Sequence, residues 1–90
     1  MPRIEYSKQA EKFLRRLPPK HGRQLATKIT ALSRDPYPPD SASLVGAPFR
    51  RADAGEYRII YDVRSETLRI VLVGKRNDAE VYRRLRRQLR

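Results

Sequence analysis

The chain has 90 residues, which is enough for one hydrophobic core, so we expect a single domain over residues 1–90. Its 21 lysines and arginines against 10 acidic residues give a formal charge of +11, which predicts a polyanionic partner: nucleic acid, an acidic protein or an anionic membrane. The absence of cysteine excludes disulfides, thiolate nucleophiles and the common zinc sites, and a single histidine argues against a histidine-based metal cluster.

Long apolar runs are absent from the sequence. No stretch approaches the roughly 20 apolar residues that a membrane-spanning helix needs, and the first residues contain no apolar core of signal-peptide length. We therefore expect a cytoplasmic protein that does not bind membranes.

The first part of the chain predicts a strand followed by two helices. Residues 3–6 alternate charged and apolar side chains, as in a short strand, and Ser7 is a candidate N-cap for the helix that follows. Pro18-Pro19 ends that helix, because the residue before a proline avoids the helical region. A second amphipathic run extends to Asp35-Pro36, so the two helices should form a hairpin. The apolar stripe of the second helix consists of Leu25, Ile29 and Leu32.

After residue 48 the apolar pattern changes from helical to strand-like spacing. Residues 36–48 contain four prolines and predict a surface loop with a short turn of helix around Ser43. The predicted strands are residues 49–52, 57–63 and 67–73, joined by turns at 54–55 and 64–66. The last strand alternates apolar side chains on both faces, as a central strand does, and Gly74 should end it.

A final helix should begin at Asn77, where Glu80 stands at the spacing of a capping box. Its apolar stripe consists of Val81, Leu85 and Leu89, and five arginines stand among and after these residues, at positions 83, 84, 86, 87 and 90. The chain is therefore predicted to be a small α+β domain: an N-terminal strand, a helical hairpin, an antiparallel sheet and a C-terminal helix, in the order βααβββα.

Basic residues from three separate segments flank the predicted sheet. Arg50 and Arg51 lie on one strand, Arg58 on the next, and Lys75 and Arg76 follow the last. A guanidinium presents a planar fork of donors that fits phosphate oxygens, so these residues are candidates for a phosphate site. The alternative is that they are solvated sheet-edge charges that discourage aggregation. Because neighbouring strand residues point to opposite faces, only one of Arg50 and Arg51 can face a shared site.

Three blocks of the C-terminal half carry a family resemblance. Residues 55–61 read Gly-Glu-Tyr-Arg-Ile-Ile-Tyr, residues 73–76 read Val-Gly-Lys-Arg, and residues 81–82 read Val-Tyr. In this order and at this spacing, the chain resembles the RelE-type toxins over residues 44–85. The strand and helical hairpin that precede this region fit the same family by pattern.

The resemblance implies an endoribonuclease that cuts mRNA in the ribosomal A site and thereby inhibits translation. The RNA's own 2′-hydroxyl would be the nucleophile, the product a cyclic phosphate, and no metal or other cofactor would take part. By position, Arg58 would stabilise the charged transition state, and Arg76 would hold the scissile phosphate or assist the leaving oxygen. Tyr82 would stack on a base or accept the 2′-hydroxyl proton. The candidate substrate-binding residues are Arg50, Arg51, Lys75 and Arg83.

The identity of the general base is left open by the sequence. Arg50 and Arg51 stand where the best-known members of the family carry a pair of lysines, and arginine does not give up its proton readily. Tyr82 is a candidate because nearby guanidinium groups favour a phenolate over a phenol. Otherwise it is a boundary aromatic that covers the apolar stripe of the last helix. Lys75 could supply a proton, whereas His21 is distant in sequence from the cluster.

Two other functions fit the same pattern. The fold family includes ParE-like toxins, which bind DNA gyrase and generally lack the tyrosine that Tyr82 represents. A plain nucleic-acid-binding module would hold phosphates without breaking a bond. Both toxin hypotheses imply a cognate antitoxin, of RelB type for a RelE-like chain, whose acidic or amphipathic segment would cover the basic face. Operator DNA would then be bound only through the toxin–antitoxin complex.

Overall fold

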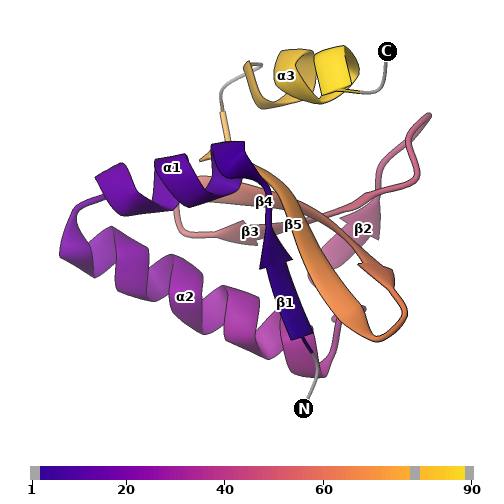
Figure 1. Cartoon of the computed structure of the whole chain (residues 1–90), viewed down its shortest axis with the longest axis horizontal. Coiled ribbons are helices and arrows are strands. Elements are labelled where there is room, and N and C mark those ends of the chain that lie inside the picture. Colours follow the sequence, from indigo (N-terminus) through magenta and orange to yellow (C-terminus); the bar gives the residue numbers. More distant parts are fainter. Residues whose placement is uncertain (1–2, 78–79, 89–90) are drawn as a thin grey trace.

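A computed structural model of the chain describes residues 3–77 and 80–88, and it confirms the predicted α+β class. Figure 1 shows a twisted sheet, a helical hairpin beside it and a third helix near the C-terminus. The elements in chain order are β1 (Arg3–Tyr6), α1 (Lys8–Arg16), α2 (Pro19–Arg34), β2 (Ser41–Ser43), β3 (Arg50–Ala54), β4 (Tyr57–Arg64), β5 (Thr67–Lys75) and α3 (Glu80–Gln88).

The helical hairpin begins and ends at the residues that the sequence predicts. The Ser7 hydroxyl accepts a hydrogen bond of 3.0 Å from the backbone N–H of Ala10, so Ser7 caps α1. Leu17, which precedes the proline pair, has an extended backbone and separates the helices, while Pro19 occupies the first turn of α2. Asp35 is the C-cap of α2. Within the described ranges, none of the helices has both the length and the apolar character needed to cross a membrane.

The sheet has the strand order β1-β5-β4-β3-β2. Strands β2 to β5 are antiparallel to their neighbours, as predicted, whereas β1 runs parallel to β5. A parallel pair requires a long crossover, and here the helical hairpin and three strands lie between its two members in sequence. The predicted N-terminal strand and antiparallel sheet are confirmed, and the structure adds that β1 joins this sheet in parallel.

Two local predictions are corrected by the structure. Ser43 does not lie in a turn of helix but in the short edge strand β2, so the element order is βααββββα rather than βααβββα. This strand forms because β3 offers it a free edge, where Ser43 pairs with Arg50. Gly74 does not end the sheet either: β5 continues to Lys75, and Gly74 lies opposite Arg58 on β4. Gly74 therefore places no side chain against Arg58.

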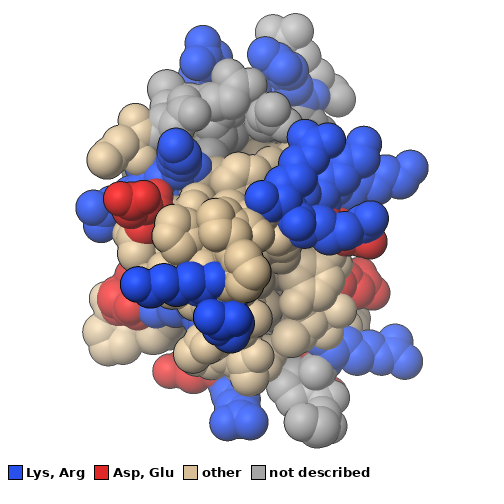
Figure 2. All heavy atoms as spheres, turned by 90° about the vertical axis from the view of Figure 1, so that its left-hand side faces the viewer, with Lys and Arg blue, Asp and Glu red and all other residues tan. Residues whose placement is uncertain are grey.

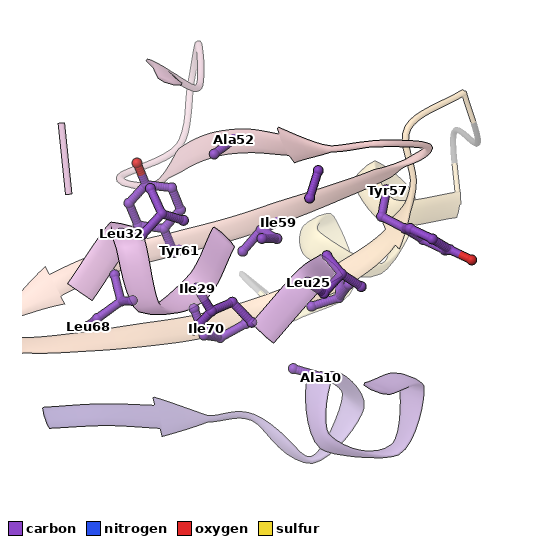
Figure 3. Packing of buried hydrophobic residues seen from close by; sticks show 12 residues of the cluster. Ala10, Leu25, Ile29, Leu32, Ala52, Tyr57, Ile59, Tyr61, Leu68 and Ile70 are labelled. Atoms are coloured by element: carbon purple, nitrogen blue, oxygen red, sulfur yellow. The ribbon is translucent and has the colours of Figure 1, made fainter. Parts of the chain in front are cut away.

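The core lies between the sheet and the α1–α2 hairpin. Figure 3 shows Ile29 and Leu32 of α2 facing Ile59 and Tyr61 of the sheet, all four of them buried. The Tyr61 hydroxyl donates to the carbonyl oxygen of Pro36 at 2.6 Å, so the one polar atom of this large buried ring is satisfied. The predicted apolar stripe of the second helix is confirmed as part of this core.

A smaller apolar cluster covers the opposite face of the sheet. Leu85 of α3 packs there against Ile60 of β4 and Leu72 of β5. Successive strand residues point to opposite faces, and an irregularity in the pairing at Ile60 and Tyr61 adjusts the register between them. Both faces of β5 are buried, as predicted for a central strand, and α3 is anchored to the sheet by Leu85.

Beyond the end of β1, two side chains form hydrogen bonds with the backbone of β5 in place of a neighbouring strand. The Gln9 amide donates to the carbonyl oxygen of Val73 at 2.8 Å and accepts from the Val73 N–H at 3.0 Å, as a neighbouring strand would. The Ser7 hydroxyl donates to the carbonyl oxygen of Val71 at 2.6 Å. Gln9 and Ser7 therefore satisfy backbone groups that β1 does not reach.

We expect Gln9→Leu to lower the free energy of unfolding by roughly 1–3 kcal/mol, because a leucine leaves the two buried backbone groups of Val73 without partners. Urea denaturation followed by circular dichroism measures this loss. The matched control is Gln24→Leu at an exposed position on α2. Equal denaturation midpoints for wild type and Gln9→Leu would contradict the assigned role.

Candidate functional site

The hairpin of β3 and β4 places Asp53 directly opposite Arg58. A two-residue turn at Gly55 and Glu56 joins the strands, and Gly55 adopts a positive φ of 59° that few other residues tolerate. Asp53 pairs with Arg58 in the strand register. Both alternate with the core residues Ala52 and Ile59, so they point to the face of the sheet on which α3 packs.

Arg58 is held by a two-point ion pair with Asp53. Its Nε donates to Asp53 Oδ1 at 2.8 Å, and its Nη2 donates to Asp53 Oδ2 at 3.2 Å. The Arg58 side chain is 16% exposed and that of Asp53 is 30% exposed, so water only partly screens the pair. The hydrogen bonds from Arg58 hold the pKa of Asp53 below its ordinary value despite partial burial, and they raise the pKa of Arg58.

Tyr82 reaches the same guanidinium from α3. Arg58 Nη1 donates a hydrogen bond to the Tyr82 hydroxyl, and the guanidinium carbon lies 5.9 Å from the centre of the tyrosine ring. Tyr82 is half-buried on α3, on the side from which Leu85 packs against the sheet. The structure therefore brings together two of the three residues predicted to be catalytic, although 24 positions separate them in sequence.

Arg51 and Arg76 lie close enough to Asp53 to act on its charge. Both contribute to lowering the pKa of Asp53, after the larger effects of Arg58. Arg51 stands two residues before Asp53 on β3 and therefore faces the same side of the sheet. Arg76 is exposed, and its backbone N–H donates to the carbonyl oxygen of Glu56 at 2.7 Å, which fixes it beside the β3–β4 turn. Asp53 thus has three arginines around it.

Two of the predicted substrate-binding residues lie away from this cluster. Arg50 points to the other face, where it donates to Ser41 and Ser43 at 2.7 and 3.1 Å and lies over the Tyr37 ring. Lys75 pairs with the core residue Tyr57 in the strand register, so its side chain also leaves the sheet on the α1–α2 face. The structure thus assigns the cluster to Arg51 rather than Arg50.

Arg83 and His21 are the other candidate residues from the sequence. Arg83 follows Tyr82 on α3 and is exposed. His21 Nδ1 lies 2.6 Å from the Tyr57 hydroxyl on the α1–α2 face, away from Arg58. The predicted capping box between Asn77 and Glu80, and the stripe positions Val81 and Leu89, lie outside the side chains that the structure describes.

Asp53 was not among the residues predicted from the sequence, although the sequence contains a signal for it. In a two-residue hairpin, the residues on either side of the turn face each other across the two strands. Asp53 and Arg58 stand at equal distances from Gly55-Glu56. Such cross-strand pairing of opposite charges predicts an ion pair. The omission arose because the turn was placed one residue too early, at 54–55.

The three arginines around Asp53 make this part of the molecule basic. On the face drawn in Figure 2, lysine and arginine side chains gather at the upper right, and acidic side chains are more scattered. The parts of the chain that the structure describes contain no group of three His, Asp or Glu side chains placed to hold a metal ion. The arginines around Asp53 can bind an anion through their guanidinium groups, and Tyr82 presents a phenol beside them.

One family model matches most of the chain. The chain matches, over residues 4–80, the family model described as the ParE toxin of the type II toxin–antitoxin system parDE. A comparison with curated proteins finds no significant match. Most of the chain is therefore similar to toxins of toxin–antitoxin systems.

Solved structures with similar folds come from RelE toxins. A chain of the archaeal RelE–RelB complex from Pyrococcus horikoshii OT3 is 30% identical, with a TM-score of 0.74 over 87% of this chain and 98% of that one. The isolated E. coli RelE toxin is 22% identical, with a TM-score of 0.74 over the whole of both chains. A chain of the RelBE2 complex from Mycobacterium tuberculosis is 27% identical, with a TM-score of 0.72 over 84% of this chain and 100% of that one.

Proposed function

Since the chain belongs to the ParE toxin family of type II toxin–antitoxin systems and has the RelE fold, we propose that it is a ribosome-dependent mRNA endoribonuclease. The observation that carries this proposal is the contact between Arg58 and Tyr82 on the basic face of the sheet. A guanidinium in contact with a phenol supplies charge stabilisation and a proton-transferring group at one place.

The proposed reaction uses the substrate's own nucleophile. The 2′-oxygen of the mRNA attacks the neighbouring phosphorus, the bond from phosphorus to the 5′-oxygen breaks, and a 2′,3′-cyclic phosphate remains. In this scheme Tyr82 acts in its phenolate form and accepts the 2′-hydroxyl proton, while the departing 5′-oxygen takes up a proton from water. Arg58 donates to the phosphoryl oxygens as negative charge builds up. Arg76 lies beside the turn, where it would hold the phosphate or assist the leaving oxygen, and Arg51 would bind the adjoining backbone.

The direct test is primer extension on mRNA incubated with ribosomes and the purified protein. Wild type is expected to produce cuts that require ribosomes, and Arg76→Ala should lower the cleavage rate roughly 10-fold through loss of one exposed phosphate contact. Arg64→Ala, at the other end of β4 and 70% exposed, is the matched control and should cut like wild type. Intact mRNA with the wild-type protein would reject the proposed function.

A second candidate function follows from the matching family model, which is that of the ParE toxin. A ParE-like protein would inhibit DNA gyrase. The contact between Arg58 and Tyr82 favours the nuclease, because gyrase inhibition needs no phenol at this position. Inhibited supercoiling by gyrase, together with intact mRNA on ribosomes, would decide for the ParE-like function.

We also propose a cognate antitoxin of RelB type. Several of the similar structures are of complexes between RelE and RelB. With a net charge of +11, the basic face would attract an acidic or amphipathic segment, which would keep mRNA from Arg58 and Tyr82. Operator DNA would be bound through the antitoxin. Co-purification of the product of the adjacent gene, with loss of mRNA cleavage in the complex, tests this partner.

A further inference from the structure

Asp53 places a negative charge at the centre of a site proposed to bind phosphate. Arg58, and to a smaller extent Arg51 and Arg76, lower the pKa of its carboxyl group, which therefore carries its negative charge at neutral pH. A carboxylate among three arginines weakens the attraction of the site for any anion, because it offsets part of their charge. Affinity for RNA alone therefore does not account for Asp53.

The geometry of the ion pair shows what Asp53 does for Arg58. A guanidinium carries five N–H donors in a fixed plane. Asp53 takes the donors of Nε and Nη2 along one edge, and Tyr82 takes one from Nη1. Two donors remain, one on each Nη atom, and both can be offered to phosphate oxygens. Arg58 can thus bind a phosphate without releasing either partner.

We propose that Asp53 is a positioning residue, which fixes the Arg58 guanidinium beside Tyr82 and reduces the ground-state affinity of the site for RNA. This inference rests on the proposed ribonuclease function. An arginine without this anchor would turn toward the bound phosphate and hold substrate and transition state equally well. Such uniform binding lowers KM without raising kcat, whereas a fixed donor acts where charge develops during the reaction.

The test separates kcat from KM in ribosome-dependent cleavage. Asp53→Asn keeps the size of the side chain but removes its charge and one acceptor for Arg58. We expect KM for mRNA on ribosomes to fall about threefold or more and kcat to fall about tenfold. A role confined to stability would lower the melting temperature and the amount of active protein, but it would not move KM and kcat in this way.

The chain offers a matched control in its second arginine–aspartate pair. Arg69 donates to Asp62 through Nε and Nη2 at 2.7 and 2.6 Å, between β5 and β4. Asp62→Asn changes the net charge by the same amount and breaks the same kind of ion pair, but it does so away from Tyr82. It should leave KM and kcat unchanged.

A second variant keeps the inference testable if Asp53→Asn does not fold. Asp53→Glu retains the charge but cannot place its two oxygens as Asp53 does, so KM should stay at the wild-type value while kcat falls. If wild type cuts mRNA but the Asp53 variants behave like Asp62→Asn, the inference is overturned and the ribonuclease function stands. If wild type does not cut mRNA, both are overturned.

Discussion

Arg58→Lys is expected to slow ribosome-dependent mRNA cleavage roughly 100- to 1,000-fold, the cost of removing one aligned donor from a developing negative charge. Lysine retains the positive charge but presents its donors from a single nitrogen atom. It cannot pair with both oxygens of Asp53 and also donate to Tyr82 and a phosphate in one plane. Single-turnover cleavage followed by primer extension measures the loss.

Arg69→Lys is the control for Arg58→Lys. Arg69 makes the same kind of two-point ion pair, with Asp62, on the same face of the sheet. We expect this variant to cut mRNA at the wild-type rate and to melt at a similar temperature to Arg58→Lys. Full activity in folded Arg58→Lys would show that positive charge suffices and that the planar guanidinium has no special role.

Tyr82→Phe is expected to reduce kcat about 100-fold or more, as is usual when a group that transfers a proton is removed. Phenylalanine retains the ring that lies near the Arg58 guanidinium, so base stacking and packing persist while the hydroxyl is lost. The variant thus distinguishes the two roles that the sequence leaves open for Tyr82. A wild-type cleavage rate would show that Tyr82 acts through its ring alone, as a stacking residue or as a boundary aromatic of α3.

Tyr57→Phe provides the comparison for Tyr82→Phe. The Tyr57 hydroxyl also has one side-chain partner, since it lies 2.6 Å from His21 Nδ1, but on the opposite face of the sheet. Its loss should change stability slightly and leave cleavage unchanged. A similar loss of cleavage in both variants would point to a general effect of tyrosine hydroxyls on the fold.

Elements with strong local signals were predictable from the sequence alone. Ser7 caps α1 because its hydroxyl accepts from a backbone N–H three residues on, and Pro18-Pro19 separates the helices through steric effects that need no tertiary context. The stripe on α2 is buried because its spacing matches the helical period. Such features depend on residues that are close in sequence.

Features that depend on a distant partner were not predictable. Ser41 and Ser43 have no strand pattern of their own, and they form β2 because β3 exposes an edge and Arg50 binds their hydroxyls. Gly74 was expected to end a strand, but the pairing with Arg58 continues it. In both cases tertiary contacts override weak local preferences.

The site itself was predicted in part. The family resemblance selected Arg58, Arg76 and Tyr82, and the structure shows Arg58 and Tyr82 in contact. The alternation of strand residues predicted that only one of Arg50 and Arg51 could face the cluster, but it could not say which, because alternation alone does not tell which face of the sheet carries the site. The register of β3 against β4 in the structure decides for Arg51. That register also determines the position of Asp53.

The parallel pairing of β1 with β5 means that the sheet can form only late in the synthesis of the chain. Residues 3–6 are made first, yet their partners are residues 67–70, and Tyr82 follows later still. Synthesis runs from the N-terminus, and contacts across such long separations form slowly because closing the loop costs entropy. The contact between Arg58 and Tyr82 therefore forms only after residue 82 has been made and has left the exit tunnel. Under the proposed ribonuclease function, an incomplete chain would lack the contact between Arg58 and Tyr82 that the reaction requires.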